Sequence, residues 1–103
     1  MDQFLLERSA KTLEEVVSQY LLDDAEVESL SYTLSKLIAD ARAGKIVSPV
    51  EWGDVPGAYS FTEGGLRKYS DLEKAYAEFK IEVSGGESPF LRSLRSESGG
   101  KGD

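Results

Sequence analysis

The chain has 103 residues, no cysteine and no histidine, and its 19 acidic and 12 basic residues give a net charge of −7. Its length fits one domain, and 40% apolar with 30% charged residues is typical of a globular protein rather than a disordered one. The missing residue types exclude imidazole bases, thiolate nucleophiles and zinc sites built from cysteine or histidine.

The same totals bear on location and partners. No apolar run is long enough to span a bilayer, and the first residues lack the basic start of a secretory signal. The lack of cysteine favours a reducing compartment. We therefore expect a cytoplasmic protein with no membrane partner. A negative field repels phosphate backbones, so we expect no direct binding to nucleic acid and instead a basic protein partner.

The first helix is predicted over about residues 9–22. Thr12 and Glu15 have the spacing of a capping box, and the helix would bury an apolar stripe on one face. That stripe is formed by Leu13, Val16, Val17, Tyr20 and Leu21. Because the stripe continues backwards through Leu6 and Ala10, the helix alternatively begins near Asp2, and both one long helix and two short ones fit the pattern.

The second helix is predicted from Ala25 to Ala43. Asp23 and Asp24 mark the break before it and supply an N-cap, and Gly44 ends it. Its apolar stripe has regular helical spacing and consists of Val27, Leu30, Leu34, Leu37, Ile38 and Ala41. The short connection between the two helices predicts an antiparallel hairpin.

Prolines and glycines interrupt the segment 45–65, which we expect to be an ordered loop. One short strand is possible near residues 58–62, since Tyr59 and Phe61 alternate with small polar residues. The alternative to an all-helical chain is therefore an α+β fold with a small strand pair within residues 46–62.

A third helix is predicted from Ser70, where Ser70 and Glu73 form a capping box, and it should end between Lys80 and Val83, before two glycines. Beyond it, Ser88-Pro89 could open an amphipathic turn that either covers a core edge or enters a partner's groove. This turn contains Phe90, Leu91 and Leu94 together with Arg92 and Arg95. Residues 96–103 are predicted to be a disordered tail.

These elements predict a mainly α fold, in which an antiparallel helical hairpin and a long ordered loop are joined by a third helix packed across the hairpin. The predicted domain spans residues 1–95. The chain contains no phosphate-binding loop, no dinucleotide fingerprint and no EF-hand loop. We therefore expect a protein that is not an enzyme and that has no cofactor and no metal; carboxylate or tyrosine catalysis is the least favoured alternative.

Two features are candidates for binding a partner. Acidic residues concentrate at the turn of the hairpin, where they either favour the positive end of a helix dipole or form a docking surface for a basic protein. Aromatic residues in the loop and on the second helix are either core anchors or interface contacts. The predicted partner-binding residues are Asp23, Asp24, Glu26, Glu28, Tyr32, Trp52, Asp54 and Tyr59.

Three functional hypotheses follow. In size, acidity and lack of catalytic groups, the chain resembles the small immunity proteins that bacteria make against their own toxins, many of which are basic nucleases. That resemblance is one of general type, and it implies an inhibitor that occludes a basic toxin. The second hypothesis is a structural or regulatory homo-oligomer that pairs through the stripe of the second helix, so that the chain is either a monomer or a homodimer. The third is an enzyme using carboxylates or tyrosine.

Overall fold

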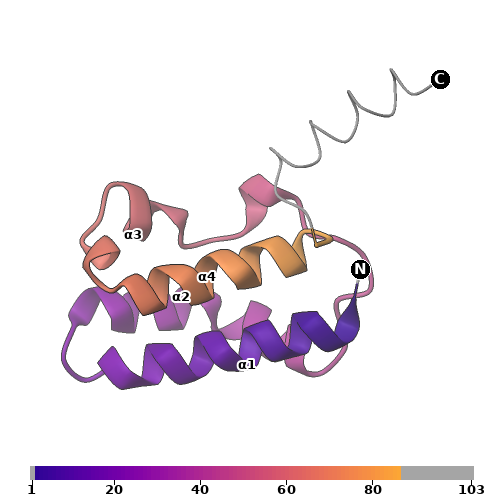
Figure 1. Cartoon of the computed structure of the whole chain (residues 1–103), viewed down its shortest axis with the longest axis horizontal. Helices are drawn as coiled ribbons and strands as arrows, with labels where there is room; N and C mark the ends of the chain where they lie inside the picture. The colour runs from indigo at the N-terminus through magenta and orange to yellow at the C-terminus, as the bar shows by residue number, and fades with distance from the viewer. Residues whose placement is uncertain (1, 87–103) are drawn as a thin grey trace, which may run out of the picture.

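The computed structural model describes residues 2–86, and the fold is mainly helical, as predicted (Figure 1). In chain order the helices are α1 (Gln3–Tyr20), α2 (Ala25–Arg42), α3 (Ala58–Thr62) and α4 (Ser70–Val83), with 3₁₀ turns at Trp52–Asp54 and Leu66–Lys68. Residues 2–86 contain no strand, so the α+β alternative is wrong. None of the helices in this range has both the length and the apolar character that a bilayer crossing requires.

α1 begins at the earlier of the two predicted positions. Asp2 is its N-cap, and an oxygen of its carboxylate accepts a hydrogen bond of 3.0 Å from the amide of Leu5. Thr12 lies inside the helix, so the predicted capping box at Thr12 is wrong. The apolar stripe decided the start, because Leu6 and Ala10 are both fully buried and hold the first turns against the core.

α2 agrees with its prediction to within one residue. Asp24 caps it by accepting hydrogen bonds from the amides of Glu26 at 2.8 Å and Val27 at 3.4 Å. The helix ends at Arg42, and Gly44 then takes a left-handed φ of 71°, a conformation that glycine adopts without steric cost.

The first two helices form the predicted antiparallel hairpin, in which Glu14 of α1 pairs with Arg42 of α2. α4 packs along the other side of α1 and also runs antiparallel to it, since Tyr20 at the end of α1 hydrogen-bonds Asp71 at the start of α4. α2 and α4 therefore run in the same direction, and the chain between them must return along the length of the bundle (Figure 1).

The returning segment is helical where a strand was considered possible. Gly57, at a φ of 100°, turns the chain into α3, and the ring of Phe61 then stacks on Tyr76 of α4 with the ring centroids 4.6 Å apart. A strand would place Tyr59 and Phe61 on one face, because side chains two apart share a face. In the helix they separate: Tyr59 is 70% exposed and Phe61 is buried.

α4 begins at Ser70, as predicted, but without the predicted capping box. The N-cap position is Tyr69, and no side chain caps the helix there. The carbonyl of Tyr69 instead accepts the amide of Glu73 at 2.9 Å. Gly85 and Gly86 end the helix with left-handed φ angles. The predicted turn of residues 88–95 and the predicted tail of residues 96–103 lie outside the described residues.

One apolar core joins all these elements. Its largest fully buried side chains come from the three long helices and the returning segment, and they include Phe79, Leu6, Leu13, Leu34, Leu66 and Leu72. Burying one such side chain contributes roughly 1.5–3 kcal/mol to folding. The core therefore fixes α1 between α2 and α4, and it leaves α1 with two grooves along its flanks.

Candidate protein-docking surface

The turn between α1 and α2 holds the acidic residues that the sequence marked, and they are not equivalent. The carboxylate of Asp24 faces inward: besides capping α2, it accepts a hydrogen bond of 2.7 Å from the hydroxyl of Tyr69 and lies 3.5 Å from the ammonium of Lys68. The hydrogen bond from Tyr69 holds the pKa of Asp24 below its ordinary value. Glu26 accepts the amide of Gly65 at 2.9 Å. Both carboxylates therefore join α2 to the end of the returning segment.

Asp23 and Glu28 have a different environment. Both are exposed, and neither forms an ion pair within residues 2–86. Two large apolar side chains are exposed in the same part of the molecule, Leu22 at 96% and Tyr32 at 84%. The turn thus presents carboxylates to solvent next to apolar surface.

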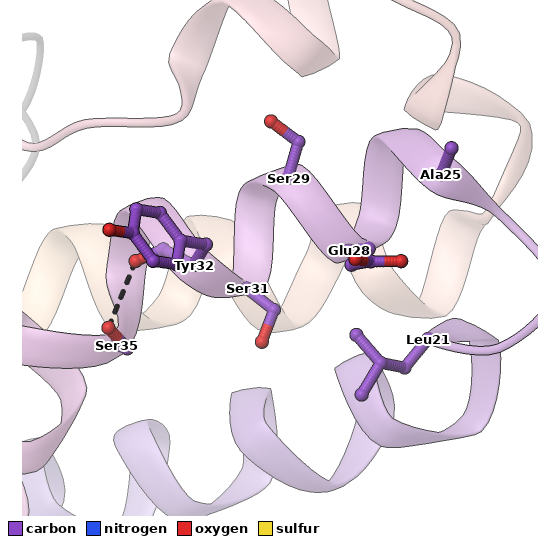
Figure 2. Close-up of a pocket in the computed structure, with 7 residues that line it drawn as sticks. All are labelled: Leu21, Ala25, Glu28, Ser29, Ser31, Tyr32 and Ser35. Carbon is purple, nitrogen blue, oxygen red and sulfur yellow. Dashed lines mark hydrogen bonds between the residues drawn. The ribbon is translucent and has the colours of Figure 1, made fainter.

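A groove lies beside this turn, between the end of α1 and the first half of α2. Its wider part is a hollow of about 660 Å³ that Figure 2 shows, lined by Leu21, Ala25, Glu28, Ser29, Ser31, Tyr32 and Ser35. A narrower hollow of about 180 Å³ shares three of these residues and continues toward the middle of α1, lined by Glu14, Val17, Ser18, Leu21, Ser31, Ser35 and Ile38. We call the two together the α1/α2 groove.

The groove has apolar, small and acidic side chains, and no lysine or arginine lines it. Leu21 reaches from the end of α1 toward α2, and the Ser31 side chain points toward α1 (Figure 2). The hydroxyl of Ser35 donates a hydrogen bond of 2.9 Å to the carbonyl of Tyr32, one turn earlier. Since Arg42 pairs with Glu14, Glu28 is the carboxylate of the groove that has no basic neighbour in an ion pair.

The three remaining predicted residues lie on the returning segment. The ring of Trp52 is half-buried beneath the ammonium of Lys80, which lies 4.4 Å from the ring centroid. Asp54 and Tyr59 are exposed. This segment packs on the flank of α2 that carries Leu30, since a Cβ on Gly57 would lie 2.7 Å from a Leu30 methyl. Glu28, by contrast, lines the flank of α2 nearer α1.

The predicted site residues therefore divide into two surfaces. Glu28 and Tyr32 line the α1/α2 groove and Asp23 lies in the turn just before α2, whereas Trp52, Asp54 and Tyr59 lie on the returning segment. The sequence reading missed several residues that line the groove, among them Leu21, Ser31 and Ser35, and it missed the exposed Leu22 of the turn. One signal was present: in a helical hairpin, Leu21 and Leu22 immediately before two aspartates place apolar side chains at the tip of the turn.

A second groove runs between α1 and α4, on the other flank of α1. It encloses about 490 Å³ and is lined by Leu5, Arg8, Ser9, Thr12, Glu78 and Glu82. Burial, and then the charges of Asp2 and Glu78, raise the pKa of Glu82 above its ordinary value. Nowhere in residues 2–86, this groove included, do three carboxylates come together in a way that could hold a metal ion.

Comparisons with protein-family models, with curated proteins and with solved structures found no match to this chain.

Proposed function

We propose that the chain is a non-catalytic protein-binding domain that captures a basic protein at the tip of its helical hairpin. The observation that carries the proposal is the turn surface, which we define as the α1/α2 groove together with Leu22 and Asp23. There, two large exposed apolar side chains lie beside two carboxylates that form no ion pair in the described chain, and no base lines the groove.

The chemistry of this surface defines the partner. Tyr32 offers an amphipathic ring of the kind enriched at interface hot spots, and Leu22 adds apolar contact area. Asp23 and Glu28 would attract lysine and arginine and would speed the association of a basic partner. The small serines of the groove let a partner approach α2 closely. The matching segment therefore carries basic side chains next to apolar ones.

The size and acidity of the chain suggest a more specific form of this proposal. In that form, the partner is a basic toxin, and binding occludes the toxin's substrate-binding surface. The net charge of −7 supports this form, because a surface that binds nucleic acid is itself basic and would be attracted to an acidic inhibitor. No catalytic group on the chain is needed, since covering the toxin's surface is sufficient for inhibition.

A homo-oligomer paired through the stripe of α2 has less support. Five residues of that stripe are buried within the chain's own core, namely Val27, Leu30, Leu34, Ile38 and Ala41. A second copy would have to pair through a different surface. The turn surface does not favour such pairing, since two copies of it would bring Asp23 and Glu28 against their own charge.

Affinity capture from the source cell's lysate, at low and at high salt, tests this proposal when it is combined with point variants. Tyr32→Ala and Glu28→Gln should each weaken the captured complex by about tenfold or more if they lie at its centre. Tyr59→Ala and Glu73→Gln are matched controls, because each removes an exposed side chain of the same type from another surface.

Two results would contradict the placement. If Tyr59→Ala weakens binding and Tyr32→Ala does not, the partner binds the returning segment instead. If no variant has an effect, the turn surface is not the site. With the purified partner, the effect of Glu28→Gln on the association rate should shrink as salt increases, because salt screens exposed charges. Assaying the partner's own activity with and without the chain then separates an inhibitor from an escort.

A further inference from the structure

The α1/α4 groove lies at the end of the molecule where the described chain stops. α4 runs toward the start of α1, and Gly86 follows it directly. A Cβ on Gly86 would lie 3.8 Å from a carboxylate oxygen of Glu82, which itself lines the groove. Gly86, the last described residue, therefore lies at the edge of this groove.

The first turn of α1 presents apolar surface here. Phe4 is 70% exposed and Leu5 is 41% exposed, and Leu5 lines the groove. Single exposed apolar residues need no explanation. Two adjacent ones, of which Leu5 lines the groove, offer a contact area on which an apolar segment can pack.

The charge of the groove is negative on its α4 side. Glu78 and Glu82 both line it, and Asp2 is close enough to influence the titration of Glu82. The ion pairs within residues 2–86 use other carboxylates. Arg8, the one basic residue that lines the groove, contributes a single positive charge from α1.

The rest of the chain contains a segment with complementary chemistry. Residues 88–95 combine three large apolar residues with two arginines, namely Phe90, Leu91, Leu94, Arg92 and Arg95. In a helical turn, residues three and four apart share a face, so Leu94 would lie beside both Leu91 and Phe90 and the three apolar side chains would form one patch. An extended chain spans at most about 3.6 Å per residue, so Phe90, four residues after Gly86, lies within about 14 Å of Gly86.

We propose that residues 88–95 dock into the α1/α4 groove of the same chain, their apolar side chains toward Leu5 and their arginines toward Glu82. The segment would cover apolar surface that α1 otherwise leaves in water and would offset the negative charge on that side of α4. This inference is independent of the proposed function, because the α1/α2 groove lies on the other flank of α1 and remains open.

The absence of cysteine makes a direct test simple. A spin label on Ser96→Cys of the full chain should attenuate the amide NMR signals of Leu5, Ser9 and Glu82, and it should leave those of Ser31 and Ser35 in the α1/α2 groove unchanged. Adding Leu91→Asp and Leu94→Asp should abolish the attenuation while the rest of the spectrum is retained, because both substitutions lie outside the described core.

Three outcomes would overturn the proposal. The first is no attenuation at Leu5 and Glu82. The second is attenuation at Ser31 and Ser35, which would place the segment in the α1/α2 groove. The third is attenuation that appears between a labelled chain and an isotope-labelled second copy and grows with concentration, which would mean docking between copies.

A charge exchange tests the role of the arginines separately. Arg92→Glu combined with Arg95→Glu should release the segment and restore the Leu5 signal. Adding Glu78→Lys and Glu82→Lys to that variant should return the attenuation, since the charges are again opposite. If the four-residue exchange leaves the segment released, the arginines do not face these two carboxylates and the proposed placement is wrong.

Discussion

The hydroxyl of Tyr69 donates a hydrogen bond of 2.7 Å to the carboxylate of Asp24, across 45 residues of chain. The other oxygen of that carboxylate caps α2. The ring of Tyr69 stacks on Tyr20 with the centroids 4.1 Å apart, and the hydroxyl of Tyr20 donates to Asp71 at the start of α4. One carboxylate and two tyrosines therefore connect the adjoining ends of α1, α2 and α4.

This connection predicts a loss of stability in acid. The hydrogen bond from Tyr69 lowers the pKa of Asp24 from its ordinary 3.8 in the folded chain. Its stabilising contribution is therefore complete at neutral pH, and it is lost as the pH falls below about 4 and through the lower folded value. Urea unfolding at a series of pH values should show a smaller acid-dependent loss in Tyr69→Phe than in the wild type. Equal losses in the two proteins would show that Tyr69 does not lower this pKa.

The same substitution, leucine to alanine, should change the free energy of unfolding very differently at a buried and at an exposed position. Leu34 is fully buried in α2, so Leu34→Ala should lower the free energy of unfolding by about 2–5 kcal/mol through lost burial and a cavity. Leu22 is 96% exposed, so Leu22→Ala should change it by no more than about 0.5 kcal/mol. Chemical denaturation measures both. A large loss in Leu22→Ala would show that Leu22 packs inside the protein rather than on the turn surface.

Gly57 should not tolerate a side chain. Its φ of 100° is strained for any other residue, and a Cβ there would lie 2.7 Å from a methyl of Leu30 and 3.2 Å from the ring of Tyr76. We expect Gly57→Ala to destabilise the fold by about 1–3 kcal/mol. Gly53→Ala is the control, since its Cβ would meet nothing within 4 Å and its φ is not left-handed. If both variants unfold at the same denaturant concentration as the wild type, the packing of Gly57 against α2 and α4 is wrong.

Tyr76 should titrate late in alkali. It is 5% exposed, its hydroxyl donates a hydrogen bond of 2.8 Å to the carbonyl of Pro56, and burial raises its pKa from 10.0 to about 12. Because the folded pKa is the higher one, this contribution to stability is complete below pH 10 and is lost as the pH rises toward about 12. The phenolate absorbance of Tyr76→Phe should therefore lack a component near pH 12. An unchanged titration would contradict the burial of Tyr76.

An element was predicted accurately when residues close in the sequence determine it, and less accurately when distant contacts do. α2 was predicted almost to the residue, because an aspartate cap, a continuous apolar stripe and a terminal glycine all agree. The start of α1 was left open between two positions, since the capping box at Thr12 competed with an apolar stripe that continues back through Leu6. Tertiary burial of Leu6 and Ala10 decided it. For the returning segment, Tyr59 and Phe61 fitted a strand by alternation alone, and only the stacking of Phe61 on Tyr76 distinguishes the helix.

The candidate site shows the same division. From the sequence, the clustering of acidic residues at the hairpin turn was visible, together with a nearby tyrosine and the absence of histidine and cysteine. Those facts established the acidic character of the turn, whereas the helical spacing of the apolar residues determined the mainly helical class. The tertiary structure decided which acids face solvent, because the orientation of a side chain depends on what packs against its helix. Asp24 and Glu26 bind the end of the returning segment, through residues that lie 39 or more positions away in the chain. Glu28 instead opens onto the α1/α2 groove.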